Sequence, residues 1–206
     1  MRYFSRLNIS ASLFHRHAHA VSILVLFLLL PIIASAQPGR IYTSLAEVKE
    51  PADVYILHLN RQHLKAVPPQ VFAFANLEEL DLSKNHIDSL PPAIGRLTRL
   101  KSLNLCRNRL HALPDSIGAL TSLNILNVSR NPLLELPPSL GNLTQLKELI
   151  LYITGVVELP PSCAALNYSL QTLDMRACPL TYDNQVAIDS LLPSPRKRWD
   201  HVCNCK

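Results

Sequence analysis

Histidine and cysteine are the side chains of this sequence best suited to chemistry, and their spacing decides which chemistry is open to them. His63 and His86 stand 23 residues apart, a spacing that recurs along the chain, so we expect them to stack about 5 Å apart, like neighbouring strands of a sheet. Two stacked imidazoles can bind a metal ion, but solvated residues at a loop edge are the commoner case. We therefore assign no metal site.

Nucleophilic catalysis needs a base beside a nucleophile. His58 and Asp81 take equivalent places on neighbouring expected strands and could pair, but Cys106 stands two repeats from His58, so that column offers no adjacent nucleophile. The sequence also holds no phosphate-binding loop, no nucleophile elbow and no pair of catalytic carboxylates. We expect a protein without enzymatic activity and without a cofactor.

The five cysteines are Cys106, Cys163, Cys178, Cys203 and Cys205. An odd number leaves at least one free thiol or an intermolecular bond. Cys203 and Cys205 lack the two-residue gap of metal or redox pairs, and no second pair completes a zinc site. Export from the cytoplasm would permit disulfides, and one hypothesis is a bridge between Cys178 and this C-terminal pair. The sequence leaves the disulfide pattern of the five cysteines undecided.

A repeat of 23 residues positions these side chains. Its first position is filled by Val54, Leu77, Leu100, Leu123 and Leu146, each 23 residues after the last, and by Leu170 after 24. Apolar residues fill positions 1, 4, 6, 11, 14, 18 and 21 of each complete repeat. A fixed period of this length indicates a solenoid, because one repeat cannot bury its apolar face alone whereas a stack can.

Each repeat divides into a strand and an irregular arm. The apolar residues at positions 4 and 6 alternate with their neighbours, as in a short half-buried strand. Position 15 is proline in five repeats, at Pro68, Pro91, Pro114, Pro137 and Pro160. Proline lacks a backbone donor and fixes φ, so this half is neither a second sheet strand nor the middle of an α-helix. We expect an extended or 3₁₀-like return path.

The pattern resembles the leucine-rich repeat family. The signature Leu-x-x-Leu-x-Leu-x-x-Asn-x-Leu is matched, with Ile or Val in places, at residues 77–87, 100–110 and 123–133, and its continuation Leu-Pro-x-x-Ile-Gly-x-Leu at 90–97 and 113–120. The chain is similar to the 23-residue subclass of plant intracellular Ras-group-related and bacterial secreted proteins. The resemblance implies an α/β solenoid, a right-handed superhelix with a parallel sheet on the concave face and short 3₁₀ or extended convex arms.

The resemblance also implies a structural role for position 9, which is Asn85, Asn108 and Asn131 in three repeats. In the family this Asn lies inside, and its amide bonds the backbone of neighbouring coils, in line with the rule that buried amides are hydrogen-bonded. Gln62, Thr154 and Cys178 take the same position elsewhere. Thr154 is internal and precedes Gly155, so we expect a looser ladder there.

The N-terminal segment differs from the repeats. Residues 1–36 hold three Arg and no acidic residue, and a 14-residue apolar core over 21–34 leads to Ala34-Ser35-Ala36. This arrangement is typical of a secretory signal peptide cleaved after Ala36, since a membrane span needs about 20 apolar residues. An uncleaved anchor is the alternative. We expect a secreted or periplasmic protein without membrane contact after cleavage.

We divide the chain into a signal peptide (1–36), an N-terminal cap (37–53), five full and one partial repeat (54–180) and a C-terminal cap (181–206). In the first cap, Ser44 and Glu47 form a capping-box pattern that predicts a short helix ending at Pro51. In the second, apolar spacing predicts a helix over 181–192, followed by an edge strand over 196–202. Its basic triplet, 196–198, protects the edge or binds an acidic surface.

The charge balance and the repeat architecture favour a protein-binding module. Without residues 1–36, 17 basic and 15 acidic residues leave a net charge of about +2, which argues against nucleic-acid binding. Solenoids recognise partners across extended concave surfaces, and leucine-rich repeat proteins mostly bind proteins, sometimes peptides or glycans. The alternatives are an inhibitor of a secreted enzyme and a structural accessory domain without a ligand.

Positions 5, 7 and 8 are expected to line the concave face, because side chains that flank positions 4 and 6 point away from the core. The expected partner-binding residues are His58, Arg61, Asp81, Lys84, Asn104, Arg107, Asn127, Arg130, Ile150, Tyr152, Ile153, Asp174 and Arg176. The bases at position 8, from Arg61 to Arg130, form a row that would attract an acidic protein or peptide. The apolar group Ile150, Tyr152 and Ile153 would anchor it. A chance run of solvated residues is the alternative.

Overall fold

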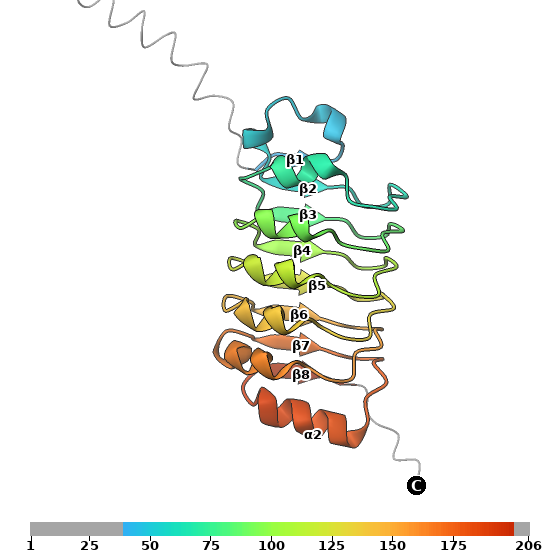
Figure 1. Cartoon of the computed structure of the whole chain (residues 1–206), viewed down its shortest axis with the longest axis vertical. Helices are drawn as coiled ribbons and strands as arrows, with labels where there is room; N and C mark the ends of the chain where they lie inside the picture. The colour runs from blue at the N-terminus through green and yellow to red at the C-terminus, as the bar shows by residue number, and fades with distance from the viewer. Residues whose placement is uncertain (1–38, 200–206) are drawn as a thin grey trace, which may run out of the picture. The chain divides into compact units, whose positions relative to one another are not determined.

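The computed structural model describes residues 39–199. The expected signal peptide, the C-terminal cysteine pair and the end of the expected edge strand lie outside the described residues. Within residues 39–199, eight parallel strands form one sheet in chain order (Figure 1). They are β1 (Ile41–Tyr42), β2 (Ile56–His58), β3 (Glu79–Asp81), β4 (Ser102–Asn104), β5 (Ile125–Asn127), β6 (Glu148–Ile150), β7 (Thr172–Asp174) and β8 (Arg196–Arg198).

The repeat period sets the register of the sheet. Leu57, Leu80 and Leu103 at position 4 face one another across neighbouring strands, and each is fully buried. Leu126 and Leu149 continue the column. Each coil therefore contributes the same apolar side chains to one continuous core, which a single repeat could not bury alone.

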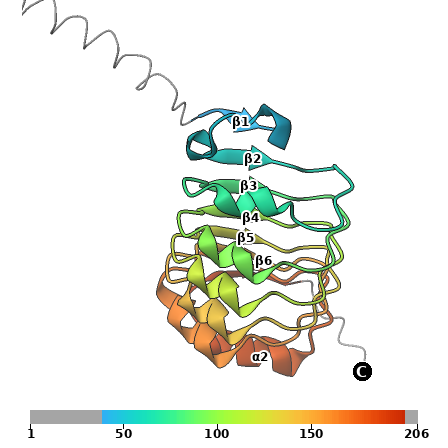
Figure 2. The same ribbon diagram turned by 45° about the horizontal axis from the view of Figure 1, so that its top comes forward.

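The second half of most coils is a short 3₁₀ helix, one of the two return paths expected from the proline at position 15. These helices are η3 (Pro69–Ala73), η4 (Pro92–Arg96), η5 (Asp115–Ala119), η6 (Pro138–Asn142) and η7 (Pro161–Tyr168). The position-15 proline stands immediately before each one. The helices lie side by side on the opposite side of the coils from the strands (Figures 1 and 2).

Glycine at position 19 allows these helices to pack closely. A Cβ built on Gly118 would lie 2.5 Å from the carbonyl oxygen of Ser139 in the next coil. This is a backbone atom, so the coils would have to move apart to admit a side chain.

The turn after each strand takes a left-handed backbone. The residue at position 8 has a φ between 54° and 58° in every repeat, from Arg61 to Ala177. The coil-to-coil ladder holds this conformation in place, because the position-8 N–H donates to the next coil, as from Lys84 to Cys106 O at 2.8 Å. Sequence reasoning missed this turn, because glycine, its usual signal, is absent from position 8.

The N-terminal segment differs from the short helix that its capping-box pattern predicts. It forms two single 3₁₀ turns, η1 (Leu45–Glu47) and η2 (Pro51–Asp53), and an unexpected strand, β1, that pairs with β2. Ser44 Oγ accepts from the N–H of Ala46 rather than that of Glu47. With Pro51 so close, no second helical turn can form, and a one-turn α-helix is not stable by itself.

At the other end, α2 (Tyr182–Leu191) lies where the apolar spacing predicts a helix. Thr181 and Asn184 form a capping box at its start, and Ile188 is buried against the core. Strand β8 pairs with β7 and places Lys197 where other coils carry the position-4 leucine. The Lys197 side chain is 10% exposed and pairs with Asp189 of α2 at 2.9 Å. An inward charge of this kind discourages further strand pairing.

Over residues 39–199, no helix combines the length and the apolar character that crossing a membrane requires.

Candidate partner-binding face

The concave face carries a column that sequence reasoning missed. The strands cover positions 3 to 5, so position 3 shares a face with position 5. Its residues are Ile56, Glu79, Ser102, Ile125, Glu148 and Thr172. The two-residue period that selects positions 5 and 7 could also have selected position 3.

This column changes the partner of His58. The expected pair with Asp81 is wrong, because His58 Nε2 lies 2.7 Å from Glu79 Oε1. Asp81 instead accepts from the backbone N–H of Ser83 at 2.8 Å and from Asn60 Nδ2 at 3.3 Å. Asp81 therefore bonds within its own coil and to Asn60 of the preceding coil, and not to His58.

The bond from position 5 to position 7 recurs along the sheet. Asn104 Oδ1 accepts from Cys106 N at 3.1 Å, and Asn127 Oδ1 accepts from Ser129 N at 3.0 Å. Asp174 accepts from Arg176 N in the same way. Four expected partner-binding residues, Asp81, Asn104, Asn127 and Asp174, thus also satisfy a backbone donor, in the manner of an Asx turn.

The coil of β6 breaks this pattern. Ile150 at position 5 offers no acceptor, and in the described chain the N–H of Tyr152 has no hydrogen-bond partner. The Tyr152 ring instead lies between two guanidinium groups, with Arg130 Cζ 5.1 Å and Arg176 Cζ 5.4 Å from its centroid. Ile153 follows, 37% exposed, with a φ of 54°. A β-branched residue rarely adopts this conformation.

Asp174 is the buried member of the expected site, only 5% exposed. Its two carboxylate oxygens accept from Arg176 Nε at 2.9 Å and Nη2 at 2.7 Å. Burial alone would raise the pKa of Asp174, but the hydrogen bonds from Arg176 and the charges of Arg176 and Arg198 outweigh it and lower that pKa. The carboxylate is thereby held charged and orients Arg176 beside Tyr152.

The basic row at position 8 lies just beyond the strands, in the left-handed turns. Arg61, Lys84 and Arg107 are exposed, and Arg130 is half-buried. No ion pair involves these four residues within the described part of the chain. The row is therefore available to acidic groups of a partner.

The candidate chemical residues do not form a common site within residues 39–199. The rings of His63 and His86 are 5.5 Å apart, with Nδ1 and Nε2 separated by 3.4 Å. Among the described residues, no group of three or more His, Cys, Asp or Glu could hold a metal ion. Cys106, Cys163 and Cys178 are free thiols. Burial raises the pKa of Cys163 to about 12.

The position-9 asparagines bond between coils. Asn108 Nδ2 donates to Leu82 O in the preceding coil and to Leu105 O in its own, and its Oδ1 accepts from Ile87 N. Asn85 and Asn131 have the same arrangement. The hydroxyl of Thr154 donates within its own coil, to Leu151 O, and its oxygen lies 3.4 Å from Cys178 Sγ of the next coil.

Two family models match the chain. One, described as a leucine-rich repeat region, matches residues 93–188, and the other, described as a leucine rich repeat, matches residues 53–110. The comparison with curated proteins gives no match.

Solved structures share the fold. A leucine-rich repeat protein of Leptospira interrogans is 28% identical with a TM-score of 0.62, over 79% of this chain and 48% of that one. The ectodomain of the plant receptor kinase GASSHO1/SCHENGEN3 of Arabidopsis thaliana, in complex with CASPARIAN STRIP INTEGRITY FACTOR 2, is 29% identical with a TM-score of 0.54, over 63% and 16%. An internalin of Listeria monocytogenes is 18% identical with a TM-score of 0.60, over 74% and 44%.

These likenesses confirm the expected fold class, a leucine-rich repeat solenoid. The chain spans about half or less of the length of each of the three structures.

Proposed function

Because the chain belongs to the leucine-rich repeat family, we propose that it is a secreted module that binds a protein partner on its concave face. The main support for this proposal comes from the coil of β6. There Ile150 takes the place of the Asp or Asn that accepts a hydrogen bond from the position-7 N–H in four other coils. Residues that lower local stability are typical of functional sites.

The neighbouring residues support the same assignment. Ile153 stays in the left-handed turn although this conformation costs an L-residue about 1–2 kcal/mol. Tyr152 is held between two guanidinium groups, and Tyr and Arg are enriched among interface residues that dominate binding energy. The basic row leads to this group, so we propose an acidic partner that is attracted by the row and anchored at Tyr152. The ectodomain of the plant receptor kinase, which is in complex with CASPARIAN STRIP INTEGRITY FACTOR 2, adds support.

Affinity capture from the extracellular fraction of the source organism tests the proposal. The wild-type protein should retain a specific protein, and Tyr152→Ala should lose it. Tyr168→Ala is the matched control, because Tyr168 is 95% exposed at the end of η7 and should retain the partner. If all three proteins capture the same set, the concave-face assignment is wrong. If the captured partner is an enzyme, its activity with and without this protein identifies an inhibitor.

The secreted location is part of the proposal and has its own test. The mature protein should begin at Gln37, after removal of residues 1–36, and N-terminal sequencing or intact mass measures this directly. A secreted form that retains residues 1–36 would show an uncleaved anchor instead. The caps, 37–53 and 181–206, would remain in the mature protein.

A further inference from the structure

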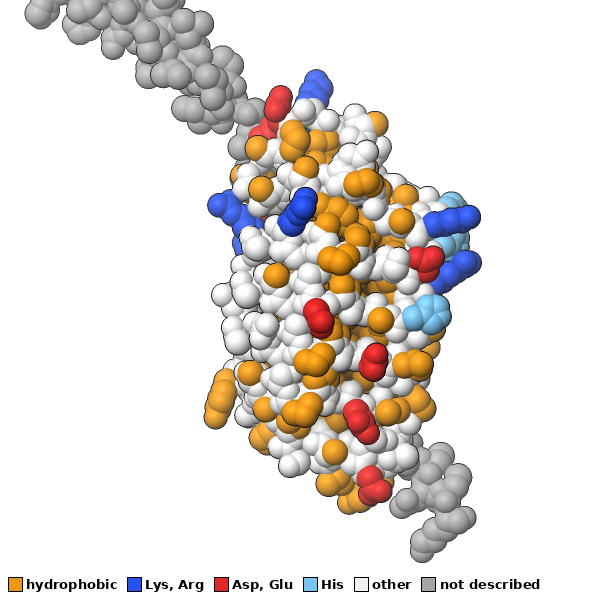
Figure 3. Space-filling view, viewed as in Figure 1, with side chains coloured by type: hydrophobic (Ala, Val, Ile, Leu, Met, Phe, Trp, Pro, Cys, Tyr) orange, Lys and Arg blue, Asp and Glu red, His pale blue; other side chains and the backbone are white. Residues whose placement is uncertain are grey.

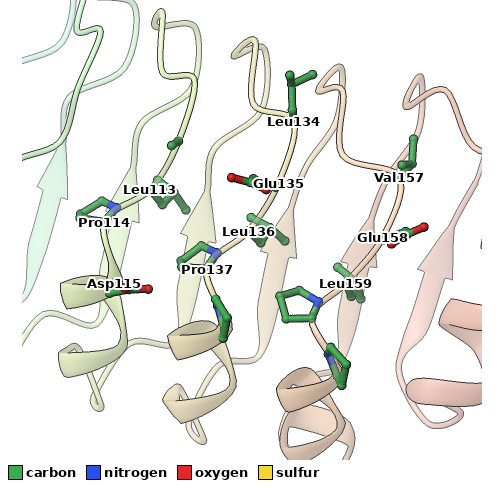
Figure 4. A pocket seen from close by; sticks show the side chains of 14 residues that line it. Leu113, Pro114, Asp115, Leu134, Glu135, Leu136, Pro137, Val157, Glu158 and Leu159 are labelled. Carbon is green, nitrogen blue, oxygen red and sulfur yellow. The ribbon is translucent and has the colours of Figure 1, made fainter.

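A second surface lies on the arms, away from the concave face. The arms that precede η5, η6 and η7 border an open groove of about 890 Å³ (Figure 4). Leu113, Leu136 and Leu159 line it and are buried as part of the core. Leu134 also lines it and is 70% exposed. The apolar surface thus continues outward from the core.

The backbone of these arms offers unused hydrogen-bonding groups. Among residues 39–199, no hydrogen bond joins the backbone of residues 134–136 or 157–159 to another group. The strands of the same coils, in contrast, are fully laddered. Backbone N–H and C=O groups need partners when they leave water. An extended polypeptide supplies donors and acceptors of the matching kind, as in the addition of a strand to an open edge.

The charge of the groove sets the charge of its occupant. Asp115, Glu135 and Glu158 line it, and no Lys or Arg does. None of the three carboxylates takes part in an ion pair with another described residue. On the face in Figure 3, which carries the 3₁₀ helices, acidic side chains form a column among hydrophobic ones, while Lys and Arg lie nearer the N-terminal coils. A cationic partner therefore fits this surface.

We propose that the groove binds an extended cationic segment of another protein, with apolar residues between its Arg or Lys side chains. The three acidic residues come from the arms of three consecutive coils, so an extended segment that runs across these arms can meet all three. The surface is separate from the concave face, so this inference stands or falls independently of the proposed function.

Fluorescence anisotropy with two labelled peptides tests the proposal. One peptide consists of repeated Arg-Pro-Leu units, and in the other each Arg is replaced by Glu. The purified protein should bind the first peptide and not the second. Glu135→Gln combined with Glu158→Gln should raise the Kd about three- to tenfold and flatten its dependence on salt. Leu134→Ala should weaken binding at every salt concentration.

The matched control carries the same loss of charge elsewhere. Glu50→Gln combined with Glu148→Gln changes two exposed carboxylates outside the groove and should leave the Kd unchanged. The proposal is overturned if the two double variants have equal effects, if the two peptides bind equally well, or if Tyr152→Ala loses binding.

It is also overturned if sedimentation shows a dimer of the wild-type protein and a monomer of the Glu135→Gln, Glu158→Gln variant, because the occupant of the groove would then be a second copy of this chain.

Discussion

The side-chain amide of Asn108 donates a hydrogen bond to the carbonyl oxygen of Leu82, 26 residues earlier, at 3.0 Å. This bond joins one coil to the preceding one, and Asn131 repeats it one coil further along. The ladder therefore ties neighbouring coils together through buried groups that water cannot reach. Thr154 interrupts this row of asparagines within the coil of β6, the coil that we assign to binding.

Replacing Asn108 with Leu should lower the free energy of unfolding by about 3 kcal/mol. The buried N–H of Ile87 loses its acceptor, and Leu82 O and Leu105 O each lose one of two amide donors, keeping those from Asn85 and Asn131. Asn104→Leu, at an only partly buried position, removes a single bond to Cys106 N and should cost about 1 kcal/mol. Asn142→Leu, at an exposed position, is the control and should stay within about 0.5 kcal/mol. Urea denaturation measures the free energy of unfolding of the three variants. The loss should be largest for Asn108→Leu, smaller for Asn104→Leu and smallest for Asn142→Leu, and any other order would contradict the structural role of the position-9 asparagines.

Replacing Ile150 with Asn should stabilise the fold. The new Oδ1 would accept from the N–H of Tyr152, as Asn127 does for Ser129, and one such bond contributes about 0.5–1.5 kcal/mol. Ile125→Asn, on the same face at position 3, gains no such bond and serves as the control. If thermal unfolding shows no difference between the two variants, the bond from position 5 to position 7 does not contribute as argued.

The ion pair between Asp174 and Arg176 should make the free energy of unfolding depend on pH in the acidic range. The pKa of Asp174 is lower in the folded protein than its ordinary value. Its stabilising contribution is therefore complete above the unfolded pKa of about 3.9 and is lost as pH falls through the lower, folded pKa. Asp174→Asn should lower stability at pH 6 more than at pH 2, measured by urea denaturation. A loss of the same size at both values would contradict the ion pair. Asp115→Asn, which removes an exposed carboxyl outside any described ion pair, is the control.

The two parts of the concave face should affect different rate constants. Lys84→Glu with Arg107→Glu should slow association with the captured partner and flatten its salt dependence, because charges that steer encounter act before contact. Tyr152→Ala should speed dissociation, by the equivalent of about 2 kcal/mol for a dominant interface residue. Surface plasmon resonance at two salt concentrations separates these effects. Binding that responds only to changes on the arms would place the partner elsewhere.

Replacing Gly118 with Ala should destabilise the protein by about 1–3 kcal/mol, because the added methyl group meets the backbone of Ser139 in a close-packed stack. Gly39→Ala meets no atom within 4 Å and should leave stability unchanged within about 0.5 kcal/mol. Differential scanning calorimetry compares the two. Equal melting temperatures would mean that the coils can move apart at little cost.

Whereas the inward position of Asn108 was implied by the resemblance to leucine-rich repeat proteins, the repeat period was sufficient to predict the stacked coils, the buried apolar positions and an extended or 3₁₀-like return after each proline. Each of these follows from a pattern that must satisfy the same environment in every coil, so the repetition itself carries the information. The partner-binding assignment of the concave face stays a prediction, since composition does not identify a ligand.

Other features depend on which atoms of neighbouring coils and turns come to lie opposite one another. His58 bonds Glu79 rather than Asp81, because the bond runs diagonally between positions 5 and 3. Asn104 is held by a backbone donor two residues away, and the left-handed turn at position 8 is held by bonds to the next coil. The groove exists only between arms that the stack places side by side. These contacts arise from tertiary packing, which local propensity and periodicity do not encode.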